Sequence, residues 1–250
     1  MRKKMIAGNW KMNCTSTMAT ELINSIKDAA NTAVCDVVVC VPFTAINASV
    51  KVAEGTKIIV SAQNIHFEDK GAYTGEISAD MLLAEGVKTA VIGHSERRQY
   101  FAETDMSVNL KTIKCLQKGI TPIVCVGECL SERQDGITFD IVAIQVKKAF
   151  KDISKQDAKK VVVAYEPIWA IGTGVVATDM QAEEVCAYIR TELEKIYDSE
   201  IADEMRILYG GSVNGKNASS LMNMPNIDGG LVGGASLNTD DFISIINSAK

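Results

Sequence analysis

The chain has 250 residues, of which 47% are hydrophobic and 23% charged, and its formal net charge is -5. This length and composition can supply one large core, so we expect a single domain over residues 1–250. Because acidic and basic residues are interspersed and form no basic stripe, nucleic acid is not an expected partner.

The apolar stretches of the sequence are short. Val37–Pro42, Val161–Tyr165 and Leu231–Ala235 are among the longest, whereas a membrane-spanning helix needs about 20 apolar residues. The N-terminal segment MRKKMIAGNWK has no apolar core of a signal peptide. We therefore expect no membrane partner and a cytoplasmic location.

The cysteines are odd in number and form no Cys-x-x-Cys pair. They are Cys14, Cys35, Cys40, Cys115, Cys125, Cys129 and Cys186. Most lie inside apolar runs, which indicates small buried thiols in a reducing compartment. Cys125 and Cys129 are a weak metal pair, because the chain has only two histidines and no further ligand stands nearby. We expect no metal and no other cofactor.

Short strand-like runs recur along the whole chain. In chain order they are Lys4–Asn9, Val37–Pro42, Ile58–Asn64, Ala90–His94, Thr121–Gly127, Val161–Glu166, Arg206–Gly210 and Gly229–Gly233. Most are continuous apolar runs and do not alternate with polar residues. This pattern is typical of strands that are buried on both faces of a parallel sheet.

Segments with a helical period of apolar residues lie between most of these runs, for example Thr104–Gln117, Phe139–Lys151 and Met180–Tyr197. Alternating strands and helices close either as an open doubly wound sheet or as a barrel. An open sheet with a dinucleotide site would place Gly-x-Gly-x-x-Gly after the first strand, where this chain has Gly8–Lys11. Eight units in about 250 residues predict an α/β protein with a single (β/α)8 barrel.

Reactive groups of such a barrel collect at the carboxyl ends of its strands. The polar or glycine residues that close the predicted strands are Asn9, Lys11, Gln63, Asn64, His94, Glu128, Glu166, Ser212, Gly233 and Gly234. Each of them alone is more typical of a loop or a helix cap. Their common position at one end of the barrel predicts a site.

Glu166 is the first candidate for a general base. It follows a buried strand and precedes a segment with proline, tryptophan and two glycines, which predicts a fixed carboxylate beneath a mobile lid. An apolar wall without an adjacent cation, which would raise the proton affinity of Glu166, is suggested by Tyr165, Pro167, Ile168 and Trp169. Glu96 and Glu128 lie near arginines, and for both we expect structural ion pairs.

Lys11 and His94 are candidates for stabilising negative charge on a substrate oxygen. Lys11 alone would be read as a surface amine, but it follows the first strand and can reach the barrel mouth. His94 lies between Gly93 and the predicted helix start Ser95–Arg98, whose free N–H groups favour a neutral ring. A neutral imidazole can donate one hydrogen bond to a carbonyl. For His66 we expect a structural role.

Two glycine-rich segments, Tyr209–Asn214 and Asp228–Ser236, close the seventh and eighth predicted strands. Barrels bind phosphate at this place through backbone N–H groups and a helix N-terminus. The sequence lacks the P-loop pattern of nucleotide-binding proteins. We therefore predict an anion site for a small monophosphate, to which Ser212 adds a hydroxyl group.

Several of these segments match one family in order along the chain. They are Ala7–Asn13, Gly93–Arg98, Ala164–Gly174, Tyr209–Val213 and Val232–Leu237. Over its full length the chain resembles the triosephosphate isomerase family. The resemblance implies a TIM barrel that interconverts dihydroxyacetone phosphate and glyceraldehyde 3-phosphate through an enediolate, as part of glycolysis and gluconeogenesis.

The resemblance also implies the role of each catalytic residue. Glu166 would carry the proton between two carbons and His94 would polarise the substrate oxygens, which is the family's own pattern of a glutamate base and a neutral histidine. Lys11 and Asn9 would bind the substrate and stabilise the developing negative charge. Glu96 would be the partner of Lys11.

The same resemblance places the phosphate on backbone N–H groups of Gly172, Ser212, Gly233 and Gly234. Gly172 would belong to the lid, whose closure would exclude water and suppress phosphate elimination. The rear hinge of the lid, Val175–Ala177, departs from the family, which more often begins it with lysine. Cys129 stands where the family usually has threonine.

A homodimer is implied in the same way. The segment Gln63–Glu76 resembles the family's interdigitating loop, which packs against the region Asn9–Cys14 of the partner. Cys14 would then lie near the subunit contact.

Two other functions remain as alternatives. An aldolase on the same barrel would use Lys11 or another lysine as a Schiff-base nucleophile. A phosphate-binding or scaffold protein without activity would carry a broken position at Lys11, His94 or Glu166, and none of the three is broken.

Overall fold

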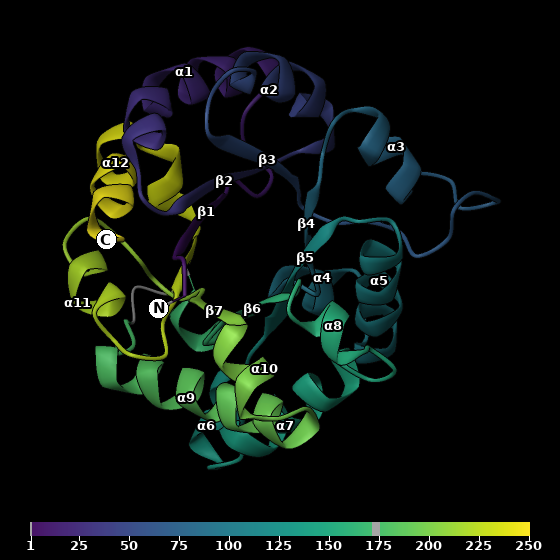
Figure 1. The fold of residues 1–250 in the computed structure, drawn as a ribbon, viewed down its shortest axis with the longest axis vertical. Helices are drawn as coiled ribbons and strands as arrows, with labels where there is room; N and C mark the ends of the chain where they lie inside the picture. Colours follow the sequence, from purple (N-terminus) through teal and green to yellow (C-terminus); the bar gives the residue numbers. More distant parts are fainter. Residues whose placement is uncertain (1, 172–175) are drawn as a thin grey trace.

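The computed structural model describes residues 2–171 and 176–250, and within them a closed barrel of eight parallel strands surrounded by helices (Figure 1). The strands are β1 (Met5–Asn9), β2 (Asp36–Val41), β3 (Ile58–Ala62), β4 (Thr89–Ile92), β5 (Thr121–Val126), β6 (Val162–Tyr165), β7 (Arg206–Tyr209) and β8 (Gly229–Val232). Each strand pairs with the next one in the sequence, and β8 pairs with β1. The predicted (β/α)8 barrel is confirmed.

Helices alternate with these strands and lie outside the barrel (Figure 1). The α-helices are α1 (Ser16–Thr32), α2 (Ile46–Ala53), α3 (Ala79–Ala84), α4 (Ser95–Tyr100), α5 (Asp105–Gln117), α6 (Leu130–Gln134), α7 (Thr138–Ala149), α8 (Lys155–Ala158), α9 (Asp179–Ile196), α10 (Ser199–Glu204), α11 (Ala218–Met222) and α12 (Thr239–Ser248). Short 3-10 turns are η1 (Phe43–Ala45), η2 (Ile168–Ala170) and η3 (Gly234–Leu237). In the described part of the chain, no helix has the length and apolarity needed to cross a membrane.

The predicted strands all exist, but most of them end one or two residues earlier than predicted. The run Ile58–Asn64, for example, is a strand only to Ala62. Gln63 turns its side-chain amide to the carbonyl groups of Lys11 and Cys40. The residues that follow the ladders are therefore free to build the mouth of the barrel.

The continuous apolar runs arise because each strand is buried on both faces. Inside the barrel, small and branched residues such as Ala7, Cys40, Cys125 and Ala164 pack together. The alternate residues of the strands face the helices, in a second and larger cluster that contains Ile6. Burial on both sides removes the polar alternation of a one-sided sheet.

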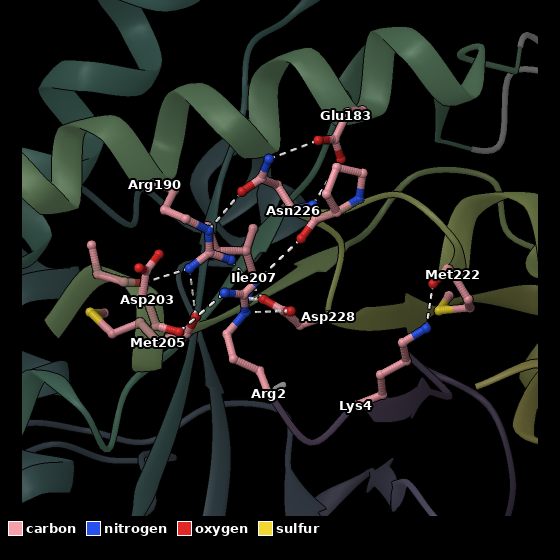
Figure 2. A network of polar contacts seen from close by, with 12 residues as sticks. Arg2, Lys4, Glu183, Arg190, Asp203, Met205, Ile207, Met222, Asn226 and Asp228 are labelled. Carbon is pink, nitrogen blue, oxygen red and sulfur yellow. Dashed lines mark hydrogen bonds and ion pairs between the residues drawn. The ribbon is translucent and has the colours of Figure 1, made fainter. Parts of the chain in front are cut away.

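A buried polar network closes the barrel between β7 and β8 (Figure 2). Asp228 accepts hydrogen bonds from Arg190 Nη2 at 2.8 Å, from Arg2 Nε at 2.6 Å and from the N–H group of Ile207 at 2.9 Å. Arg190 also donates to Asn226, which in turn donates to Glu183. The network joins the N-terminal segment, α9 and the two strands, at the barrel end opposite the strand carboxyl ends.

The connection between β3 and α3 is the longest excursion from the barrel. It projects outward beside α3 (Figure 1). Residues 69–76 in this loop are exposed, whereas His66 stacks on Phe67 and on Tyr73, with ring centroids 4.4 Å and 4.5 Å apart. The aromatic contacts order the base of a loop whose tip has little contact with its own barrel.

Candidate active site

The predicted site residues gather at the carboxyl ends of the strands. A cavity of about 220 Å³ opens there, and Asn9, Lys11, His94 and Glu96 contribute to its lining. These residues come from the ends of β1 and β4, which are separated by two strands. The barrel brings them together because all of its strands run in the same direction.

Glu166 follows the last residue of β6, and its side chain is almost fully buried. Its backbone N–H donates to the carbonyl of Val126 at 2.7 Å. An added Cβ at Gly127 would lie 1.8 Å from the Glu166 carbonyl oxygen, and one at Gly210 would lie 2.9 Å from its Cγ. Glycines directly after both neighbouring strands are therefore required for Glu166 to occupy this position.

The carboxylate of Glu166 has two polar partners in this structure. Oε1 lies 2.9 Å from Nε2 of His94, and Oε2 accepts the N–H group of Ser95 at 2.9 Å. Burial raises the pKa of Glu166, but His94 and the Ser95 N–H lower it by more, so the net pKa is lowered. The expectation of a raised proton affinity for Glu166 was therefore wrong.

The aromatic residues that we expected to form an apolar wall beside Glu166 also make polar contacts. The side chains of Tyr165 and Trp169 donate hydrogen bonds to Glu128 at 3.2 Å and 2.8 Å. Arg133 lies 3.4 Å from the same carboxylate. The structural ion pair that we expected for Glu128 is confirmed, and it anchors the two aromatic residues that flank Glu166 in sequence.

His94 is the N-cap of α4, and its Nδ1 atom accepts the backbone N–H of Glu96 at 3.2 Å. A nitrogen that accepts this bond carries no proton, so the geometry favours the tautomer with its proton on Nε2. Burial lowers the pKa of His94, but the Glu166 carboxylate raises it by more, and the net pKa is raised. Separation of Glu166 from the ring would therefore favour the neutral imidazole.

Lys11 adopts a left-handed backbone conformation with φ of 53°. This conformation is costly for a residue with a side chain, so it needs support from neighbouring groups. Asn9 Oδ1 accepts the Lys11 N–H at 3.1 Å, and Gln63 Nε2 donates to the Lys11 carbonyl at 2.8 Å. The ammonium group lies 2.7 Å from Oε1 of Glu96. Glu96 is thus in contact with Lys11, as the resemblance implied.

The predicted phosphate residues follow β7 and β8. An added Cβ at Gly233 would lie 3.6 Å from Cε of Lys11, so this glycine backbone borders the lysine side chain. Gly233 caps η3 and Gly234 begins it, and within this turn Ser236 donates its hydroxyl to the Gly233 carbonyl at 2.6 Å. Ser212 follows β7, and its carbonyl accepts the side-chain amide of Asn217 at 2.9 Å.

One predicted site residue is not described by the structure, and three residues that the sequence did not suggest contribute to the site. Gly172 lies outside the described residues. Sequence reasoning missed the N–H group of Ser95 and the two glycines, Gly127 and Gly210, that make room for Glu166. The available signal was the glycine that follows both β5 and β7 directly, at the level where Glu166 follows β6.

Among residues 2–171 and 176–250, the structure holds no group of three or more His, Cys, Asp and Glu side chains that could bind a metal ion. The cysteines are free, and Cys14 and Cys129 are partly exposed whereas the other five are buried.

A glutamate, a histidine and a lysine lie together at the carboxyl ends of the strands of a (β/α)8 barrel, which is where TIM-barrel enzymes have their active sites. Residues 4–249 match the family model described as triosephosphate isomerase. The chain belongs to the triosephosphate isomerase family.

Individual relatives agree with the family model. The triosephosphate isomerase of Acetivibrio thermocellus is 53% identical over 249 residues, which cover 100% of this chain and 99% of the relative. The triosephosphate isomerase of Alkaliphilus oremlandii is 51% identical over 247 residues, covering 99% of this chain and 100% of the relative. A Clostridium botulinum triosephosphate isomerase is also 51% identical over 247 residues, with the same coverage of both chains.

Proposed function

We propose that this chain is a triose-phosphate isomerase that interconverts dihydroxyacetone phosphate and glyceraldehyde 3-phosphate in glycolysis and gluconeogenesis. The observation that carries the proposal is the approach of the Glu166 carboxylate to Nε2 of His94 at 2.9 Å, next to the Lys11 ammonium at the barrel mouth. A base, a hydrogen-bond donor and a cation then act on the same three-carbon substrate. Family membership supports the same reaction.

In the proposed mechanism, Glu166 removes a proton from the carbon next to the carbonyl group. The electron pair of that C–H bond forms the C=C bond of an enediolate, and the carbonyl oxygen becomes negatively charged. His94 donates from Nε2 to this oxygen, while the Lys11 ammonium and the Asn9 amide stabilise the charge. Glu166 then gives the proton to the neighbouring carbon, while the hydroxyl proton on the first carbon passes to the negatively charged oxygen, so that the first carbon now carries the carbonyl group and the neighbouring carbon a hydroxyl group.

Substrate binding must change the contact between the two catalytic groups. The Glu166 carboxylate lies against Nε2 of His94, and this nitrogen has only one proton that it can donate in a hydrogen bond. A substrate oxygen that accepts the hydrogen bond from Nε2 displaces the carboxylate of Glu166 from His94 toward the substrate carbon. Loss of the carboxylate contact lowers the pKa of His94, which keeps the ring neutral in the complex.

The phosphate group is proposed to bind at the ends of β7 and β8. Gly233 is the N-cap of the 3-10 turn η3 and Gly234 is its first residue, and Ser212 lies after the adjacent strand. Such a backbone offers N–H groups to an anion, and the side chain of Lys11 borders it. We assign Gly172 to the same phosphate site and to the lid on the strength of the family motif alone.

An isomerisation assay tests the proposal. With glyceraldehyde 3-phosphate as substrate, we expect fast conversion that a chelator leaves unchanged, and incorporation of deuterium from solvent into the recovered triose. Glu166→Gln should abolish the activity, whereas Glu192→Gln, a buried carboxylate in α9, should retain it. Covalent trapping of substrate by borohydride would support the aldolase alternative, and no rate above buffer would end the proposal.

We also propose a homodimer in which the β3–α3 loop reaches the partner's Asn9–Cys14 region. Tyr73 in this loop is 43% exposed, and Met12 in the Asn9–Cys14 region is 97% exposed. Exposed large apolar side chains on both segments fit a protein surface better than water. Sedimentation of the wild type should give twice the chain mass, and Tyr73→Asp should lower it toward the monomer. Wild-type protein that sediments as a monomer at micromolar concentration would contradict the dimer.

The whole chain, residues 1–250, is proposed to act as one domain in the cytoplasm. Free thiols support a reducing compartment, since all seven cysteines lack a disulfide partner. Limited proteolysis should release no stable fragment, and fractionation of cells should recover the activity with cytoplasmic enzymes. A stable proteolytic subdomain or a secreted activity would contradict this assignment.

A further inference from the structure

A buried charge cluster lies against Gly93, the residue before His94, and has no part in the mechanism above. Its centre is the Glu103 carboxylate, which is 2% exposed and lies 2.8 Å from Nε of Arg97 and 3.1 Å from Nζ of Lys111. Lys111 is also buried, and it donates a hydrogen bond to Asn64 at 2.9 Å. Burial lowers the pKa of Lys111, and the Glu103 carboxylate opposes that shift. Such a cluster is costly to bury, which calls for a function.

The Glu103 carboxylate also holds the backbone that carries His94. Its Oε1 atom accepts the N–H group of Gly93 at 3.3 Å. From the other side, Nε of Arg98 donates to the Gly93 carbonyl at 2.8 Å. Both polar groups of the residue that precedes His94 are therefore held by buried or half-buried charged side chains.

Gly93 itself has little freedom to find another arrangement. Its φ is 72°, and an added Cβ would lie 2.7 Å from Val108 Cγ2. It follows the last residue of β4, so the strand ladder no longer fixes its peptide plane. The carboxylate of Glu103 and the guanidinium of Arg98 do so instead.

We propose that Glu103 is a positioning residue for His94. The carboxylate fixes the Gly93 peptide, which fixes the backbone of the N-cap His94 and so aims its Nε2 atom at the substrate oxygen. Lys111 and Arg97 compensate the buried charge that this task requires. The kinetic consequence rests on the proposed isomerase function, because a displacement of about 1 Å of a catalytic group costs roughly 100-fold in rate.

The test replaces the buried pair of Glu103 and Lys111 together, so that no buried charge is left alone, while the guanidinium of Arg97, whose side chain is 26% exposed, can be hydrated. Glu103→Met/Lys111→Met keeps a similar volume, and such replacements of buried pairs are often tolerated by the fold. We expect the kcat of this double variant to fall by at least about fivefold while KM changes by less than about twofold. Glu103→Gln retains an oxygen that can accept the Gly93 N–H, so its kcat should lie between those of the double variant and the wild type.

Glu192→Met is the matched control. Glu192 is 1% exposed and pairs with Lys147 and Lys195, but it lies in α9, and none of the hydrogen bonds or ion pairs of the described residues joins it to Gly93 or His94. We expect this variant to keep the wild-type kcat. Wild-type kcat in the double variant, or an equal loss of kcat in Glu192→Met, would overturn the positioning role.

A spectroscopic measurement separates this proposal from the proposed function. The ¹⁵N signals of the His94 ring report its hydrogen bonds to the Glu96 N–H and to Glu166 whether or not the enzyme turns over. They should move in Glu103→Gln and in the double variant, but not in Glu192→Met. Unmoved His94 signals in both Glu103 variants would overturn the inference, whereas an inactive wild type would overturn the isomerase proposal alone.

Discussion

Nε2 of His94 and Oε1 of Glu166 lie 2.9 Å apart, and this contact shifts the pKa values of the two groups in opposite directions. Both side chains are buried, so little solvent screens their interaction. Each group is therefore the main electrostatic partner of the other, and a change at one should alter the protonation of the other.

Shortening the base should impair turnover more than binding. Glu166→Asp withdraws the carboxylate by one methylene, and we expect kcat to fall by about 100-fold or more with a much smaller change in KM. Steady-state kinetics with glyceraldehyde 3-phosphate measures both constants. The control Glu192→Asp should retain wild-type kcat, and an unchanged kcat in Glu166→Asp would remove Glu166 from its role.

The protonation of His94 should depend on Glu166. The carboxylate favours the charged ring, so Glu166→Gln removes the main cause that raises the pKa of His94 and leaves burial, which lowers it. We expect the His94 pKa to fall in this variant, and to fall less in Glu96→Gln. NMR titration is direct because the chain has only two histidines, and His66→Gln assigns the signals. A His94 pKa that stays unchanged in Glu166→Gln would contradict the contact.

The same pair should stabilise the protein within a limited pH window. The Glu166 pKa is lowered from 4.5, so its contribution is present above that value and is lost as the pH falls through the folded pKa. The His94 pKa is raised from 6.5, so its contribution is present below that value and is lost as the pH rises through the folded pKa. Thermal unfolding should show the largest difference in Tm between wild type and Glu166→Gln near pH 5–6, and smaller differences at lower and at higher pH.

Thiol modification should act through Cys14. Burial raises the pKa of Cys40 and of Cys115 to about 12, so these thiols carry almost no thiolate at pH 8 and should react slowly. In a Cys129→Ser background, a bulky reagent should modify Cys14 first and weaken both the dimer and the activity. Mass spectrometry, sedimentation and the isomerase assay follow the three events.

Cys14→Ser in the same background is the control and should resist the reagent. Protein that is modified only at Cys14 and keeps its dimer and its rate would show that Cys14 lies away from the subunit contact.

Loss of the Asp228 carboxylate, at the barrel end opposite the strand carboxyl ends, should destabilise the fold. Asp228→Asn leaves the buried guanidinium of Arg190 without its anion, and breaking a buried pair costs about 3–5 kcal/mol. Denaturant unfolding at fixed protein concentration measures the loss. Asp157→Asn, in the surface pair with Lys160, should change stability little. Equal stability of Asp228→Asn and the wild type would mean that the network in Figure 2 contributes nothing.

The strands and the barrel were predictable from the sequence because burial on both faces is a local property of a run of residues. Val161–Glu166 contains only apolar residues before its final carboxylate, and it forms β6 to within one residue at each end. Glu166, His94 and Lys11 were predictable as site residues since each follows such a run. Their sequence settings suggested a base and two groups that stabilise negative charge, the family motifs made these roles specific, and the roles remain proposals.

The partners of these residues were not predictable in the same way. Lys11 and Glu96 are 85 positions apart, and the N–H group of Ser95 is 71 positions from Glu166. No periodicity connects such residues, because their distance depends on the closure of the barrel. The expectation of a raised proton affinity for Glu166 was wrong for this reason. The groups that lower its pKa, His94 and the N–H group of Ser95, are distant from it in the sequence.

The sequence alone determined the (β/α)8 architecture, the end of the barrel where chemistry occurs and the family to which the chain belongs. The tertiary structure decided which charges meet, which glycines make room for Glu166 and how Glu103 reaches the backbone before His94. Strand burial is encoded within a few consecutive residues, whereas pKa values and hydrogen bonds depend on groups that only the folded barrel brings within about 3 Å of each other.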